Sequence, residues 1–159
     1  MVEMSVAGIA LDAASRTPIV LLRDPSGRRQ VPIWIDQTQA HNIMAGLQGT
    51  EQPRPLSHDL MAALLVAGGL ELERVIVHAI EDSTFHAVLK LRQTDPLEQA
   101  DEENTVLHDV DARPSDAIAL AVRTGSSIWM LEEVVAEASI AVDAEADARD
   151  QSDFNRFVD

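Results

Sequence analysis

Short runs of apolar residues with alternating character fill the first 35 residues of the chain. They predict three strands, over residues 4–11, 18–22 and 30–35, because alternation with a period of two is the pattern of a half-buried strand. The segment Asp24-Pro25-Ser26-Gly27 predicts a turn between the second and third strands. Pro32 lies inside the third run and indicates an edge strand or an irregular start.

The pattern changes to helical spacing after residue 35. Asp36 and Gln39 have the spacing of a capping box, in which each side chain accepts a hydrogen bond from the other residue's backbone N–H. Gly49 suits the end of this helix. The apolar positions between these ends are Ala40, Ile43, Met44 and Leu47.

A proline-containing loop over residues 50–56 separates this helix from a second one. Ser57 is the expected N-cap of the second helix, and Gly68-Gly69 is its expected end. Its apolar positions predict an inward face made of Leu60, Met61, Leu64 and Leu65.

The second half of the chain repeats the order of the first. Strands are predicted over residues 72–80, 84–91 and 105–111, with a polar acidic loop over 93–104. A helix then begins at Pro114, where the missing N–H costs nothing, and ends at Gly125. Its buried stripe is expected to be Ile118, Ala121 and Val122. A short strand over 127–130 and a short helix over 131–138 follow.

The predicted fold class is therefore α+β. A duplicated β-β-β-α unit would form a mixed or antiparallel sheet with helices packed on it, followed by a short C-terminal strand, a helix and a tail. We expect one domain over residues 1–140 and an acidic C-terminal tail over 141–159, whose aromatic end would dock on a partner subunit. If the two halves are related, their strand-to-helix turns are expected to face each other across a cleft.

Charge separates the tail from the domain and bears on the function. The chain has 159 residues and a net charge of −15, and the residues from Glu132 onward contribute −7 of it. Such a field repels phosphate backbones, which counts against non-specific binding of nucleic acid. The chain has no cysteine, no membrane-spanning run and no basic start typical of a signal peptide. We therefore expect a cytoplasmic protein with no membrane partner.

The first cluster of candidate chemistry lies where the last long strand meets its helix: Asp111, Arg113, Ser115 and Asp116. Asp116 falls in the first helical turn, where the helix dipole favours an ionised carboxylate. Two acids beside an arginine could hold a divalent cation and a phosphate. Alternatively, Asp116 only complements the helix terminus and Arg113 locks the turn.

The second cluster precedes the second helix and contains Arg54, Ser57, His58 and Asp59. Backbone amides at a helix start can bind an anion, and His58 could act as a general base or a metal ligand. Alternatively, Ser57 caps the helix, Asp59 complements its dipole and His58 lies on the surface. His78, His86 and His108 lack ligand spacing, and five aromatic residues are too few for a base-stacking platform.

Four segments together resemble the bifunctional nuclease domain family, also known as a domain of unknown function. They are Val31-Pro32-Ile33-Trp34-Ile35, residues 54–60 (RPLSHDL), Asp82-Ser83-Thr84-Phe85 and residues 111–120 (DARPSDAIAL). The resemblance covers roughly residues 3–138. It implies an α+β fold, a homo-oligomer and, for plant relatives, nuclease activity on RNA and DNA. This chain departs from the family pattern at Gln39, where Glu is common, and at His86, where Tyr is common.

Two hypotheses follow from the resemblance and the residues. In the first, the chain is a metal-dependent phosphodiesterase acting on RNA or DNA. Asp111 and Asp116 would hold Mg²⁺ or Mn²⁺, and His58 with Asp59 would activate water or protonate the leaving group. The phosphate would be steadied by Arg54, Arg113 and Ser115. In the second, the chain is a non-catalytic oligomeric module of the bacterial cytoplasm, a dimer or larger, that binds a protein partner or a small anion.

Overall fold

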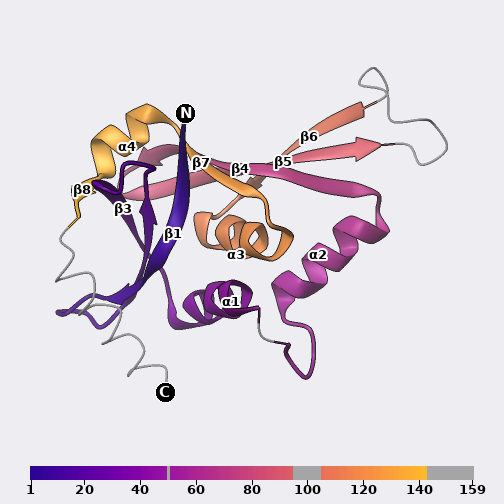
Figure 1. Cartoon of the computed structure of the whole chain (residues 1–159), viewed down its shortest axis with the longest axis horizontal. Coiled ribbons are helices and arrows are strands. Elements are labelled where there is room, and N and C mark those ends of the chain that lie inside the picture. Colours follow the sequence, from indigo (N-terminus) through magenta and orange to yellow (C-terminus); the bar gives the residue numbers. More distant parts are fainter. Residues whose placement is uncertain (50, 95–104, 143–159) are drawn as a thin grey trace.

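A computed structural model describes residues 1–49, 51–94 and 105–142 of the chain. They form one eight-stranded, mostly antiparallel sheet in the order β6-β5-β4-β7-β1-β2-β3-β8, with four helices (Figure 1). The strands are β1 (Val2–Leu11), β2 (Pro18–Arg23), β3 (Arg29–Trp34), β4 (Leu70–Glu81), β5 (Thr84–Thr94), β6 (Thr105–Ala112), β7 (Ser127–Met130) and β8 (Ile140–Ala141). The helices are α1 (Gln37–Gln48), α2 (Ser57–Ala67), α3 (Pro114–Thr124) and α4 (Glu132–Ala138).

Two antiparallel meanders occupy the two sides of this sheet. One consists of β1, β2 and β3, and the other of β4, β5 and β6. β7 joins them, because it pairs in parallel with β4 and antiparallel with the first residues of β1. The register of β1 shifts between Val6 and Gly8, so the strand bends where it leaves β7 and continues along β2.

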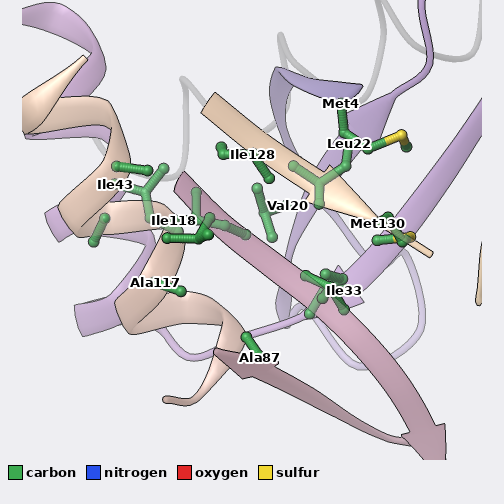
Figure 2. Packing of buried hydrophobic residues seen from close by; sticks show 14 of the residues in the cluster. Met4, Val20, Leu22, Ile33, Ile43, Ala87, Ala117, Ile118, Ile128 and Met130 are labelled. Atoms are coloured by element: carbon green, nitrogen blue, oxygen red, sulfur yellow. The ribbon is translucent and has the colours of Figure 1, made fainter. Parts of the chain in front are cut away.

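The core lies between the sheet and helices α1 and α3. Ile43 of α1 and Ile118 of α3 are fully buried against strand residues such as Val20 and Ile33 (Figure 2). The helices α1, α2 and α3 lie together beside the sheet, and α4 lies apart from them, packed on β3 and β4 (Figure 1). This arrangement brings the N-termini of α1 and α3 to the ends of β3 and β6.

Several predicted helix ends are confirmed. Asp36 and Gln39 form the reciprocal capping box of α1, with backbone-to-side-chain distances of 2.7 and 2.9 Å. Gly49 and Gly125 end α1 and α3 in the left-handed conformation, at φ of 62° and 71°. Pro114 is the first residue of α3. Since each of these residues satisfies or avoids an orphan backbone group, the sequence signal was local and strong.

The predictions for α2 were wrong in two respects. Ser57 is the first helical residue, and Leu56 takes the N-cap position, where its backbone N–H donates to Asp59 at 2.8 Å. The expected inward face is largely exposed: Leu60, Met61 and Leu64 are 54%, 40% and 60% exposed. The helix is apolar around most of its circumference, so its sequence pattern did not select one face.

The α+β class, the element order, the mixed sheet and the C-terminal β7 and α4 are as predicted, with β8 as an additional short strand. A β-β-β-α order occurs twice, but descent of the two halves from a duplicated unit stays a hypothesis. The expectations for the acidic loop and for the tail beyond residue 142 lie outside the described residues. Within the described part of the chain, no helix is both long enough and apolar enough to span a membrane.

Candidate functional site at the turns into α1 and α3

The turn from β6 into α3 places three polar side chains around one helix start. Arg113 is the N-cap residue; it is exposed, and its guanidinium makes no ion pair or hydrogen bond with any described residue. Ser115 is 5% exposed, yet its hydroxyl has no partner among the described residues. Pro114 fixes the backbone between them. The helix dipole and the free backbone amides of this turn favour an anion.

Asp116 and His58 meet although 58 residues separate them in the chain. The distance from His58 Nε2 to Asp116 Oδ1 is 3.0 Å, and it joins the first turns of α2 and α3. His58 is 4% exposed, and its buried Nδ1 has no hydrogen-bond partner among the described residues. The side chain of Asp116 is 45% exposed. In this pair the Asp116 carboxylate is therefore accessible to solvent, and the buried imidazole of His58 holds it in position.

Asp59 holds the helices together through both of its oxygens. One accepts from the Leu56 backbone N–H, and the other accepts from Arg123 Nε at 2.7 Å. The Leu56 N–H and then Arg123 hold the pKa of the Asp59 carboxyl below its ordinary value. Arg123 also donates to the backbone oxygen of Ala119 at 2.8 Å. These contacts keep Asp59 ionised and bind α2 to α3.

A cavity of about 270 Å³ opens between the turn into α1, the β4–β5 turn and the turn into α3. Gln39 from the turn into α1 and Arg113 and Ser115 from the turn into α3 line this one cavity, while a pseudo-twofold relation between the two turns stays a hypothesis. The β4–β5 turn adds Ser83 and Phe85, and β3 adds Trp34. Three of the four segments that resemble the nuclease family therefore meet at one cavity.

The remaining predicted residues lie apart from this cavity. Asp111 is exposed on β6, opposite Val88 of β5, and Arg54 is exposed in the loop before α2. Neither lines the cavity at the turns, and neither do His58, Asp59 and Asp116, of which Asp116 directly follows Ser115 in the chain. Among the described residues, no three His, Asp or Glu side chains gather into a group that could hold a metal ion. The structure thus brings together His58 with Asp116 and Arg113 with Ser115, and leaves Asp111 and Arg54 outside both pairs.

The β4–β5 turn carries backbone strain beside the cavity. Asp82 and Ser83 have φ of 48° and 65°, so both occupy the left-handed region that Gly and Asn normally supply in a two-residue hairpin. Positions of this kind are found preferentially at functional sites. Of these two residues, Ser83 lines the cavity and Asp82 does not.

Three residues of this region were not predicted from sequence. Arg123 lies 64 residues from its partner Asp59, so no local pattern could indicate the pair. Trp34 and Phe85 were noted only within family segments, because aromatic residues on strands ordinarily signal a core. The unusual feature is that Trp34, at the end of the proline-containing strand β3, is 54% exposed.

Comparison with known proteins agrees with the resemblance. Two uncharacterised proteins of Mycobacterium tuberculosis, MT1877 of strain CDC 1551 / Oshkosh and Rv1829 of strain ATCC 25618 / H37Rv, are each 37% identical to the chain over 147 residues. The alignments cover 92% of this chain and 82% of each relative. Residues 20–143 match the bifunctional nuclease domain, a range that contains all four segments described above. The chain therefore belongs to the bifunctional nuclease domain family.

Proposed function

We propose that this chain is a nuclease that hydrolyses phosphodiester bonds of RNA or DNA at the turn from β6 into α3. The name of its family supports chemistry of this kind. The observation that carries the proposal is the 3.0 Å contact between His58 Nε2 and Asp116 Oδ1. It joins two family segments and leaves the second oxygen of Asp116 without a partner among the described residues.

The proposed roles follow from burial. Asp116 is the exposed member of the pair, so it accepts the proton of the attacking water. His58 is 4% exposed and its Nε2 is occupied, so it positions Asp116 and does not meet the substrate. Arg113 and Ser115 hold the phosphate, the first by charge and the second by its hydroxyl. Asp59 keeps α2 in place through Arg123.

A divalent cation would be Mg²⁺ or Mn²⁺, and Asp116 is the residue that would hold it. Asp111 was expected to share the cation, but it lies on β6 opposite Val88 and no described contact joins it to Asp116. Mg²⁺ in phosphate sites commonly takes one or two carboxylates together with substrate oxygens, so the single carboxylate of Asp116 suits only a cation that is shared with the substrate. When bound, the ion would polarise the phosphate oxygen.

The test is cleavage of a labelled single-stranded RNA and of a plasmid, each with Mg²⁺, with Mn²⁺ and with EDTA. We expect Asp116→Asn to slow cleavage about a hundredfold or more, which is the usual effect of losing a general base. His58→Ala should slow it less. The matched control is Asp109→Asn, since Asp109 is an exposed aspartate paired only with Lys90 on the neighbouring strand. If all four proteins cleave equally, the activity is contamination and the proposal fails.

A second candidate function is a non-catalytic oligomeric module, and the exposed apolar surface of α2 favours it. Leu60, Leu64 and Val66 are 54%, 60% and 79% exposed on one helix, which is unusual for a surface facing only water. The net charge of −15 and Gln39 in place of Glu also favour a role other than nucleic-acid cleavage.

Light scattering after size-exclusion chromatography tests this candidate. We expect a homodimer or larger assembly for the wild type and dissociation by Leu64→Glu, because a charge cannot be buried unpaired at an apolar interface. Gln48→Glu, an exposed position on α1, is the control and should leave the assembly unchanged. A wild type that is monomeric at high concentration would contradict the oligomer.

A further inference from the structure

The cavity between the turns combines features that neither proposed function uses together. It is lined by the cation Arg113, the hydroxyl of Ser115, the amide of Gln39 and the rings of Trp34 and Phe85. None of the described residues that line it is acidic, although Asp36, Asp82 and Asp116 adjoin lining residues in the chain. The lining itself therefore offers an anion one cation and no carboxylate.

One side of the cavity is prepared for an anionic group. Ser115 is 5% exposed and lines the cavity at the start of an 11-residue helix. Its hydroxyl has no hydrogen-bond partner among the described residues and is not among the fully buried unpaired atoms, so it is open to a ligand in the cavity. Arg113 is also free of ion pairs with described residues. A ligand oxygen at this position would accept from Ser115, from the guanidinium of Arg113 and from the free amides of α3.

Two aromatic residues in the lining offer a flat surface to a ring. Two of the five aromatic residues of the chain, Trp34 and Phe85, line this cavity. Trp34 remains 54% exposed, and its Nε1 donates to Asp12 Oδ2 at 3.0 Å, which fixes the ring although little packs on it. Gln39 Oε1 is used by the capping box, so its Nε2 is left to donate to a ring nitrogen or oxygen.

The size of the cavity limits what can occupy it. At about 270 Å³ it is close to the lower end of the range for small-molecule sites, about 300–1,000 Å³. It accommodates one nucleotide-sized group and excludes a duplex. Base stacking on one aromatic side chain, together with an arginine contact to phosphate, is the minimal recognition of a single nucleotide.

We infer that this cavity binds one nucleoside monophosphate, with the base against Trp34 and Phe85 and the phosphate at Arg113 and Ser115. The nucleotide can be free or can be the phosphorylated end of a single strand, since both present the same ring and anion. The inference rests on the proposed function only in placing a phosphate at Arg113 and Ser115. It states in addition that the site holds one nucleotide and not a continuous strand.

Isothermal titration calorimetry of the full chain tests the inference directly. The probes are AMP, adenosine, ribose 5-phosphate, and a short single-stranded RNA with and without a terminal phosphate. We expect AMP to bind at least about tenfold more tightly than adenosine or ribose 5-phosphate, because each lacks one of the two recognised groups. If AMP binds, the occupant of the cavity is the free nucleotide. If AMP does not bind and only the phosphorylated RNA does, the occupant is the end of a strand.

Matched variants separate the two halves of the site. Arg113→Gln and Ser115→Ala should each weaken AMP binding by about tenfold or more and leave adenosine binding unchanged. Trp34→Leu should weaken AMP binding about five- to hundredfold, and Trp34→Phe should retain most of it. Arg28→Gln, an exposed arginine on the β2–β3 turn outside the cavity, is the control.

The outcomes are distinguishable from those of the nuclease assay. Tight AMP binding that depends on Arg113 and Trp34 supports the inference even in a chain that cleaves nothing. Equal affinities for AMP and adenosine overturn the inference, even in a chain that cleaves RNA. So do equal affinities for RNA with and without the terminal phosphate. Failure of every probe to bind a correctly folded wild type also overturns it.

Discussion

Four polar side chains are buried in the described part of the chain: Asp24, Gln30, His58 and Ser115. Asp24 and Gln30 are satisfied, because Ser26 and Arg29 donate to the first and Arg23 donates to the second. His58 Nδ1 is fully buried and has no hydrogen-bond partner among the described residues, which costs about 1–3 kcal/mol. The Ser115 hydroxyl also has no partner among the described residues, but it lines the cavity at the turns and is not among the fully buried unpaired atoms. Asp24 and Gln30 stabilise the fold, whereas His58 and Ser115 belong to the candidate site.

The carboxyl of Asp24 predicts how the stability of the fold depends on pH. The Ser26 hydroxyl, followed by Arg29, lowers its pKa to about 2. A lowered pKa in the folded protein means that the contribution to stability is present above the ordinary pKa of about 4 and is lost as the pH falls toward 2. We expect Asp24→Asn to reduce the free energy of unfolding at pH 7, with the difference from wild type shrinking between pH 4 and 2. Urea unfolding across this range measures it, and a constant difference would contradict the assignment.

Ser83 provides a second residue-scale prediction. Its φ of 65° is strained for Ser and unstrained for Gly, so Ser83→Gly should raise the free energy of unfolding by about 0.5–1 kcal/mol. Ser139→Gly is the control, because Ser139 has φ of −75° and gains nothing from glycine. Urea unfolding of both variants measures the free energy of unfolding. A loss of stability in Ser83→Gly would contradict the prediction and would mean that the Ser83 hydroxyl contributes more to stability than its backbone strain costs.

At the scale of elements, the close crossing of α1 and α3 holds the two turns in place. A Cβ built on Gly46 of α1 would lie 2.6 Å from Val122 Cγ2 and 2.9 Å from Arg123 Nη1 of α3. Arg123 is itself fixed to Asp59 of α2 and to Ala119. Gly46 thus permits α1 and α3 to pack closely, with their N-termini following β3 and β6.

Gly46→Ala tests this packing. Helix propensity alone would stabilise the variant by about 1 kcal/mol, but the clash should make it less stable than wild type by about 1–2 kcal/mol. The paired control is Val122→Ala, which removes the nearer of the two obstructing atoms and leaves Arg123 Nη1 in place. In that background Gly46→Ala should cost less stability than in the wild type, as measured by urea unfolding. If Gly46→Ala reduces the free energy of unfolding equally in both backgrounds, the strain does not come from contact with Val122.

The elements show why some of the fold could be predicted and some could not. Local signals were sufficient for α1 and α3, since Asp36, Gly49 and Pro114 each act on a neighbouring backbone group. They failed for α2, because its exposed face is as apolar as its packed one, and only tertiary contacts distinguish Leu64 from the buried His58. A helix that keeps a histidine inside and leucines outside cannot be oriented from its pattern alone.

At the scale of the whole molecule, the site depends on topology. The family segments placed Arg113, Ser115 and Asp116 at a helix start, and that much followed from sequence. The contacts of Asp116 with His58 and of Asp59 with Arg123 join positions 58 and 64 residues apart, so they arise only when α2 docks on α3. The cavity at the turns is lined by residues from segments 33–39, 83–85 and 113–115, and none of these described lining residues is acidic, in a chain of net charge −15.

The central claim is that His58 and Asp116 act as one unit at the site of phosphodiester cleavage. It is tested most directly by a double-mutant cycle on the rate of cleavage of one labelled RNA, comparing wild type, His58→Ala, Asp116→Asn and the double variant. Because His58 acts only through Asp116, the double variant should be no slower than Asp116→Asn alone. Two independent effects that multiply in the double variant, or four equal rates, would contradict the claim.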